Sequence, residues 1–215
     1  IESEATQAEA AADAREFSEE FRYTATATGG IVVFDAVTDL IFSSAIEGLI
    51  LAVGLTGVFL VVAYGILERK PMLGIVNVFP ILIAIAYLIG TMRYLGLSLN
   101  AVTATILSIS IGLGIAYSVH ATHRFIDEFN AGSGAHEAMV TTLTGTGGAL
   151  LGSMLTTSLG TGALALAITP VLGDFGLLMA LSVFYSFAMA VIALPPAVLL
   201  WARYQKAGAF EGLAG

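Results

Sequence analysis

The sequence predicts an all-α membrane protein that crosses the bilayer several times. Apolar residues make up 57% of its 215 positions and charged residues only 11%, whereas about a quarter of a soluble domain is charged. Five apolar stretches of about 18 residues or more carry almost no charge, which is the length that a membrane-spanning helix needs. This composition excludes a soluble globular domain, and the absence of cysteine excludes structural disulfides and thiolate metal sites.

Residues 1–40 are predicted to be the C-terminal remnant of an extracytoplasmic α/β domain. Nine of the sixteen acidic residues lie there against two arginines, a balance unsuited to nucleic acid. Residues 4–21 predict a surface helix and residues 22–28 alternate as a strand does, but one helix and one strand do not form a stable sheet domain. Because no basic leader follows Ile1, we expect no signal peptide and a chain that belongs to something longer. The apolar stripe of the surface helix is Ala10, Ala14, Phe17 and Phe21.

A transmembrane bundle is predicted over residues 41–206, with a cytoplasmic tail at 207–215. Its five spans end at charged turns or at connections rich in glycine and proline, and lie at about 45–67, 72–89, 101–119, 147–168 and 175–201. Pro195-Pro196 interrupts the fifth span. Residues 120–145 predict an amphipathic cytoplasmic helix that glycines interrupt at 132–134.

Basic residues near the span ends predict the orientation. One side of the predicted bundle holds Arg69, Lys70, Arg124, Arg203 and Lys206, and the other side holds only Arg93. Because basic residues accumulate on the cytoplasmic side, the N-terminal segment is expected outside and the C-terminus in the cytoplasm. The predicted location is the cell membrane, crossed several times.

The third span has polar residues on two sides. Thr103, Ser110, Tyr117 and Arg124 are spaced by sevens and share one helix face, with Gly114 beside them and His120 at the margin. The opposite side carries Thr105, Ser108 and Gly112. This pattern predicts a helix in the middle of the bundle, and both helix packing and a polar path through the membrane remain open.

A polar cluster follows at the cytoplasmic end of this span. His120, His123 and Asp127 are spaced so that they could offer three metal ligands, but Arg124 lies among them. An interfacial cluster that anchors the helix to lipid head groups is favoured, and no metal site is predicted.

The fourth span is rich in small residues. Gly148 and Gly152, and Ser153 and Thr157, stand four apart, a spacing typical of close helix packing in lipid. Thr156 and Thr157 fall near the middle of the membrane, where they either pack or take part in function. The sequence contains no paired carboxylates, no Ser/His/Asp arrangement and no HExxH motif, so neither an enzyme nor a cofactor is expected.

Three segments resemble the RND transporter superfamily: "SISIGLGIAYSVHATHRFIDEF", "GTGGALLGSMLTTSLGTGALALAITPVLGDFGLLMALS" and "LPPAVLL". They are most similar to the branch that holds the mycobacterial large membrane proteins, the hopanoid exporters, and Patched and its sterol-sensing relatives. The resemblance implies a half-transporter of one helix, an outer domain and five further helices, driven by an intramembrane proton relay. The relay motif Gly-x-Asp-Tyr corresponds to Gly114-Ile115-Ala116-Tyr117, so the acid is replaced by Ala116.

Alanine cannot carry a proton, so the resemblance implies the non-titrating half, the second one, of a proton-driven exporter of hydrophobic small molecules or lipids. A companion half, in the same full-length chain or in a homodimer, would supply an acid to Tyr117 and to Thr156 and Thr157. Replacement of the acid in this particular chain is an alternative explanation. Three other functions stay open: a sterol-sensing-like lipid sensor without pumping, a Sec auxiliary, and, last, a metal-dependent membrane enzyme. Membrane lipids are expected partners, and nucleic acid is not.

Overall fold

The computed structural model describes residues 7–19, 29–97 and 101–211, and the secondary structure there is helical. The helices are α1 (Gln7–Glu19), α2 (Gly30–Leu67), α3 (Met72–Leu95), α4 (Ala101–Asn130), α5 (Ala135–Gly162), α6 (Pro170–Ile192) and α7 (Leu194–Glu211), with a 3₁₀ turn at Ala163–Leu166. Five stretches are long and apolar enough to cross a membrane: Val32–Leu67, Met72–Leu95, Thr103–Asn130, Ala135–Leu166 and Pro170–Gln205. The predicted fold class is therefore confirmed. The strand expected at 22–28 lies outside the described residues.

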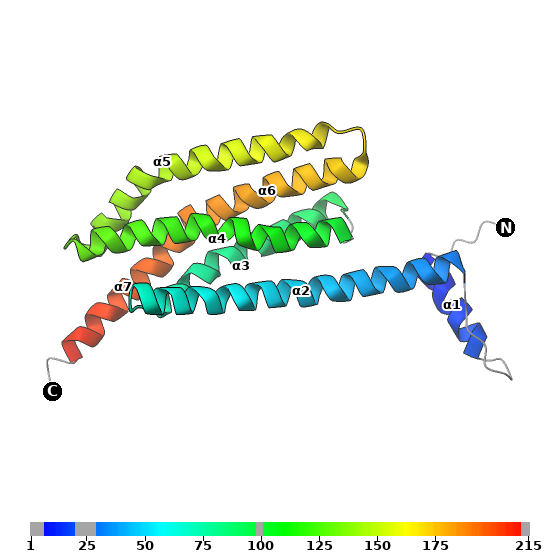
Figure 1. The fold of residues 1–215 in the computed structure, drawn as a ribbon, viewed down its shortest axis with the longest axis horizontal. Coiled ribbons are helices and arrows are strands. Elements are labelled where there is room, and N and C mark those ends of the chain that lie inside the picture. Colours follow the sequence, from blue (N-terminus) through cyan, green and yellow to red (C-terminus); the bar gives the residue numbers. More distant parts are fainter. Residues whose placement is uncertain (1–6, 20–28, 98–100, 212–215) are drawn as a thin grey trace.

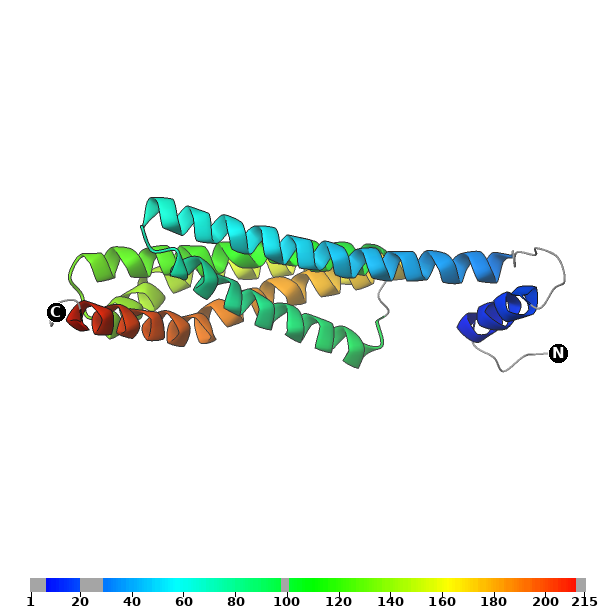
Figure 2. The same cartoon turned by 90° about the horizontal axis from the view of Figure 1, so that it is seen from below.

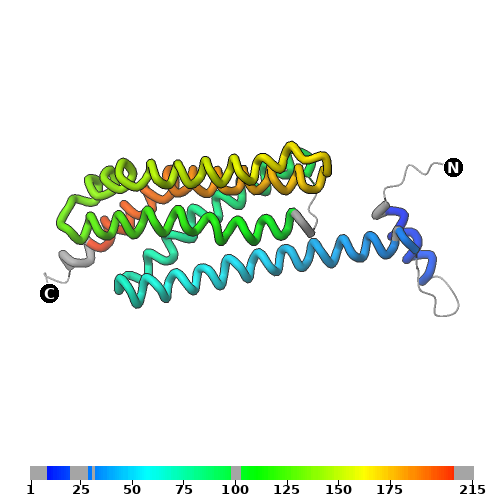
Figure 3. The backbone as a smooth tube through the Cα atoms, turned by 45° about the horizontal axis from the view of Figure 1, so that its top comes forward, coloured from blue at the N-terminus to red at the C-terminus, as the bar shows by residue number. Residues whose placement is uncertain are grey.

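The spans run alternately up and down, and α7 continues the direction of α6 (Figure 1). In Figures 1 and 3, α4 lies between α2 and α5, α6 runs alongside α5, and α3 crosses behind α4. The α2–α3 turn, the α4–α5 turn and α7 gather at one end of the bundle, which we call the basic end. There the Lys70 ammonium donates a hydrogen bond to Asn130 at 2.9 Å and lies 5.6 Å from the centre of the Trp201 ring.

Helix α2 is too long to lie wholly within a bilayer. Its 38 residues extend over about 57 Å, against about 30 Å of hydrocarbon. Counted back from Leu67, one bilayer thickness ends near Glu47, so the first turns project beyond the other helices, as Figures 1 and 2 show. Arg15 of α1 forms an ion pair of 2.7 Å with Asp35 on this projection. The expected apolar stripe of α1 is not its packed face, because Phe17 is 65% exposed whereas Ala11 is fully buried.

Proline and charge set the ends of the helices. Glu68 and Lys70 both donate their backbone N–H to the carbonyl of Tyr64, which closes the α2–α3 turn just before Pro71. At the other break, α6 ends at Ile192, and α7 begins at Leu194 with the two prolines at its start. Because proline has no N–H to donate, it is tolerated in the first turn of a helix and interrupts a helix elsewhere.

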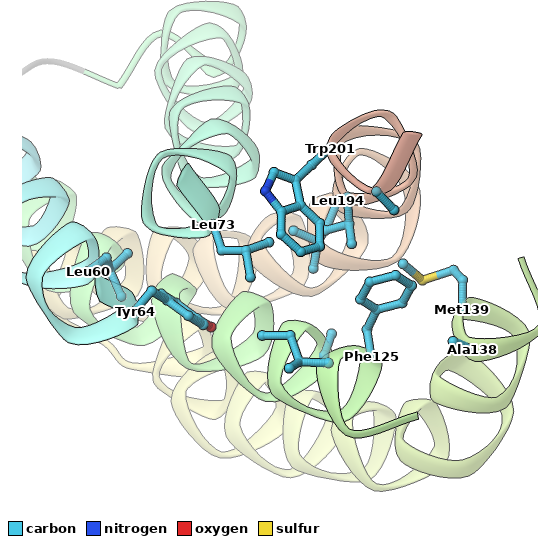
Figure 4. Close-up of a cluster of buried hydrophobic side chains, with 12 residues drawn as sticks. Leu60, Tyr64, Leu73, Phe125, Ala138, Met139, Leu194 and Trp201 are labelled. Atoms are coloured by element: carbon cyan, nitrogen blue, oxygen red, sulfur yellow. The ribbon is translucent and has the colours of Figure 1, made fainter. Parts of the chain in front are cut away.

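The largest buried cluster lies at the basic end and joins five helices (Figure 4). Phe125 of α4 and Leu73 of α3 are fully buried there, next to Trp201 of α7. Phe129 stacks on Phe125 with ring centres 5.6 Å apart. In lipid, such close packing holds helices together chiefly by dispersion. This cluster fixes α4 against its neighbours and so positions the residues of the candidate site.

Candidate functional site

Helix α4 lies at the centre of the described bundle and contacts α2, α3, α5 and α6. Its inner face carries hydroxyl groups, since Thr103, Ser110 and Tyr117 are 2%, 3% and 6% exposed. Ser182 of α6 donates a hydrogen bond of 2.5 Å to the Ser110 hydroxyl, which donates in turn to the carbonyl of Ile106. A row of hydroxyl groups thus lies inside this chain.

Gly114 allows α4 and α6 to approach each other closely on the same face. A Cβ atom built on Gly114 would lie 2.7 Å from the Ser186 hydroxyl. Ser186 and Ser182 are both buried. A side chain at position 114 would therefore force the side chain of Ser186 to move.

Tyr117 lies in a small apolar cluster formed by α4, α5 and α6. Its ring is nearly perpendicular to Phe187, with centres 6.0 Å apart, and Met154 and Val183 complete the surroundings. The expectation that Tyr117 meets a companion half directly needs correction, because α5 and α6 of its own chain cover it. A docked partner would reach Tyr117 only if those helices moved.

The outer face of α4 presents Ala116 instead. Ala116 is exposed, as are Thr105, Ser108 and Gly112, and all four line hollows between α4 and α2. Successive residues of a helix are about 100° apart, so Ala116 and Tyr117 point to different sides although they adjoin in sequence. The position that corresponds to the relay acid therefore faces outward from this bundle.

The small residues Gly148, Gly152, Ser153 and Thr156 of α5 lie on its exposed side, whereas Ser158, nearer its end, packs on α6. Gly148, Gly152 and Ser153 are exposed, and no described atom lies within 4 Å of a Cβ built on either glycine. Thr156 is exposed too, and its hydroxyl bonds to the carbonyls of Gly152 and Ser153 at 3.0 Å. The expected close packing through these residues is thus absent from the described part of the chain. Thr157 is half-buried.

The predicted polar cluster lies at the basic end. His120, His123 and Arg124 are exposed, and Nδ1 of His123 lies 3.7 Å from Oε1 of Glu68. Arg124 pairs with Glu128 one turn later. Within the described ranges, no three side chains of the His, Cys, Asp and Glu types lie together as a metal site would need.

A buried polar group that the sequence did not indicate lies between α2, α3 and α4. Asn77 is fully buried; its amide donates to the carbonyl of Leu73 at 2.8 Å and accepts a hydrogen bond of 2.9 Å from Thr122. The Tyr64 hydroxyl lies close to both side chains without a hydrogen bond of good geometry. The sequence contained one sign of this contact, the amide of Asn77 within an apolar span, because a polar group in lipid needs a hydrogen-bond partner.

A groove between α2 and α4 passes Ala116 on its way to the basic end. It encloses about 530 Å³, and its lining includes Phe59, Leu67, Gly112, Ala116, Glu68 and His123. A second hollow of about 390 Å³ continues along the same two helices toward the opposite end. Such volumes lie within the usual range of small-molecule sites.

Comparison with known proteins identifies the family. The sequence model of the MMPL family matches residues 2–209. The chain belongs to the MMPL family. This agrees with the resemblance to the mycobacterial large membrane proteins and makes the chain a transporter-type membrane domain. No solved structure matches the chain significantly.

One relative supports the membrane assignment. A protein of Methanocaldococcus jannaschii, described as a membrane protein, is 33% identical over 152 residues. The match covers 71% of this chain and 39% of the relative, so this chain spans well under half of that protein's length.

Proposed function

We propose that this chain is the transmembrane half of a proton-driven exporter of hydrophobic or lipid substrates. It lacks the relay acid and works with a companion half, in the same full-length chain or in a homodimer. Its MMPL membership over residues 2–209 carries the proposal of transport. The basic end faces the cytoplasm and the N-terminal segment lies outside the cell membrane, as the distribution of basic residues favours.

The distribution of acids supports the need for a companion. The acids of the described spans and their turns lie at the two ends: Asp35, Asp39, Glu47 and Asp174 toward the end opposite the basic end, and Glu68, Asp127, Glu128 and Glu137 at the basic end. Between these positions the described spans contain no Asp or Glu. A proton that crosses the bilayer must therefore use a titrating group from elsewhere in the assembly.

The exposed small residues of α5 support a place for the companion. Gly148, Gly152, Ser153 and Thr156 are exposed among Leu151, Leu155 and Leu159, and small residues let helix backbones approach closely in lipid. Ala116 is exposed on α4, which packs against α5. A companion docked on this surface would bring its acid near position 116. A movement of α4 would then carry the effect of that acid to the hydroxyl groups of Ser110 and Tyr117 on the inner face of the same helix.

Transport by the full-length protein tests the proposal. In proteoliposomes with an imposed pH gradient, we expect proton influx to drive the export of a fluorescent lipid. Tyr117→Phe keeps the ring contact with Phe187 but removes the hydroxyl, and export should fall at least about tenfold if the hydroxyl belongs to the relay. The matched control is Tyr87→Phe, since Tyr87 is 56% exposed. Equal export by the two variants would refute the role of Tyr117.

A lipid sensor without pumping is the second candidate, and Ala116 favours it. A sensor needs no proton path, so the loss of an acid at this position is no defect. The same proteoliposomes distinguish the candidates, because a sensor binds the lipid without any proton flux that depends on it.

A further inference from the structure

We propose that α4 has a second register against α6, four residues from the observed one, in which the hydroxyl of Ser118 gains a hydrogen-bond partner. In this second register, α4 lies about 6 Å nearer the end of the bundle opposite the basic end. The inference deepens the proposed function and rests on it, because the companion's acid is proposed to act through a movement of α4.

Small and polar residues line the contact of α4 with α6 at intervals of four. In the observed register, Ser182 donates its hydrogen bond of 2.5 Å to Ser110. One turn later, a Cβ atom built on Gly114 would lie 2.7 Å from the hydroxyl of Ser186. The residue numbers of these contacts rise together, so the two helices run parallel. One pair of hydroxyl groups and one close glycine contact thus form this part of the interface.

The next polar residue of this row on α4 is unsatisfied in the observed register. Ser118 follows Gly114 by four residues and is 1% exposed. Its hydroxyl forms no hydrogen bond with any described residue. Four residues after Ser186, α6 carries Ala190, whose side chain cannot form a hydrogen bond. A buried hydroxyl without a partner is unfavourable, because nothing replaces the hydrogen bonds that it makes with water.

A shift of α4 by four residues forms the same two kinds of contact again. Gly114 then lies at the level of Ser182, and Ser118 lies at the level of Ser186, within reach of its hydroxyl. The order serine, glycine, serine on α4 therefore fits the two serines of α6 in either register. Packed interfaces tend to hold such discrete arrangements rather than to deform continuously.

The residues on either side of this row favour one direction of movement. Ser110 moves past Ser182 in the proposed shift, but its own hydrogen bond of 2.6 Å to the carbonyl of Ile106 lies within α4 and is kept. The opposite shift would place Ile106 against Ser182, and an isoleucine side chain cannot accept a hydrogen bond. Movement away from the basic end therefore satisfies Ser118 without leaving Ser110 unpaired.

A hydrogen bond between α4 and α3 favours the observed register. Thr122 follows Ser118 by one turn and donates at 2.9 Å to Asn77, and both partners are buried. Because Asn77 belongs to α3, this bond breaks when α4 moves along its axis. A signal that populates the second register must therefore overcome the contact between Thr122 and Asn77.

Disulfide formation in the full-length protein, with any other cysteine removed, tests the second register; residues 1–215 contain none. The reporting pair is Ser118→Cys with Ser186→Cys, whose Cβ atoms reach the disulfide distance of about 3.5–4.5 Å only after the shift. The matched control is Ser110→Cys with Ser186→Cys, which starts one turn apart in the opposite sense and separates further. Ser110→Cys with Ser182→Cys reports the observed register. Copper phenanthroline serves as the oxidant for all three pairs.

The yields are compared in proteoliposomes with and without a pH gradient. Without a gradient, Thr122→Val should raise the yield of the reporting pair about fivefold, the factor that corresponds to one lost hydrogen bond, and leave the control pair unchanged. An imposed gradient should raise the same yield without this substitution. If Thr122→Val fails to fold, Asn77→Ala removes the same hydrogen bond.

The outcomes separate this inference from the proposed function. Equal yields of the reporting and control pairs in every condition would overturn the second register, even if the protein exports lipid. A rise of the reporting pair in Thr122→Val without any proton-driven export would support the second register and refute the proposed transport.

Discussion

Gly74 is the position where a single methyl group should separate two spans. A Cβ atom built there would lie 2.4 Å from the backbone nitrogen of Val61 and 2.6 Å from the carbonyl carbon of Leu60. Ordinary contact begins at 3.4 Å, so Gly74→Ala forces α2 and α3 apart by about 1 Å (3.4 − 2.4). The opposing atoms belong to the backbone of α2 and cannot turn away as a side chain would.

The expected cost follows from this geometry. Overpacking of a close contact costs about 1–3 kcal/mol, and separation of the helices also loosens the contact of Leu60 with Leu73. Replacing glycine by alanine within a helix returns about 0.5–1 kcal/mol. We therefore expect Gly74→Ala to lower the free energy of unfolding by about 1–2 kcal/mol.

Gly90→Ala supplies the control on the same helix. No described heavy atom lies within 4 Å of a Cβ built on Gly90, so this variant should be neutral or stabilised by up to about 0.5–1 kcal/mol. Trp201 is the single tryptophan and lies buried at the basic end, so its fluorescence reports unfolding in mixed micelles. If Gly74→Ala is as stable as Gly90→Ala, the close approach of α2 and α3 is refuted.

Three further predictions concern polar contacts and are measured by the same unfolding assay. A double-mutant cycle of Asn77→Ala and Thr122→Val should give a coupling of about 0.5–1.5 kcal/mol, and additive effects would contradict their hydrogen bond. Ser182→Ala should cost about 1 kcal/mol through loss of its hydrogen bond to α4, and an unchanged stability would show that this bond contributes nothing. Lys70→Met should cost less than about 1 kcal/mol, since the cation lies near the surface, while shifting the emission of Trp201; an unshifted emission would mean that the two side chains do not touch.

The positions of the spans follow from the sequence because apolar runs and charged turns leave few alternatives. The second span was expected from residue 72, and α3 begins at Met72. The third span was expected to end near residue 119 and an amphipathic helix to follow, and in the structure the two form the single helix α4, which ends at Asn130. It continues because Ala121 and Phe125 remain buried on its inner side, so helical packing persists beyond the apolar stretch.

The neighbours of each helix face could not be predicted in the same way. Periodicity shows that α5 has a small-residue face but not whether that face meets its own chain, and in the structure Gly148 and Gly152 meet no described residue. Asn77 was missed because a single polar residue forms no pattern. Its role depends on Thr122, forty-five positions away, and only the folded arrangement of α3 and α4 brings the two together.

The two faces of α4 explain how a chain can keep a tyrosine next to a lost acid. Tyr117 contributes its ring to the packing of α5 and α6, a contact that Tyr117→Phe would keep. Position 116 lies on the other side, where a small side chain lines the groove between α2 and α4. Neighbours in sequence are thus under different physical constraints, and the loss of a carboxylate at position 116 leaves the packed core intact. An acid restored by Ala116→Asp should therefore lower the free energy of unfolding by about 2–3 kcal/mol, because a carboxylate among apolar side chains within a membrane span is poorly solvated; an unchanged stability would show that position 116 is open to water.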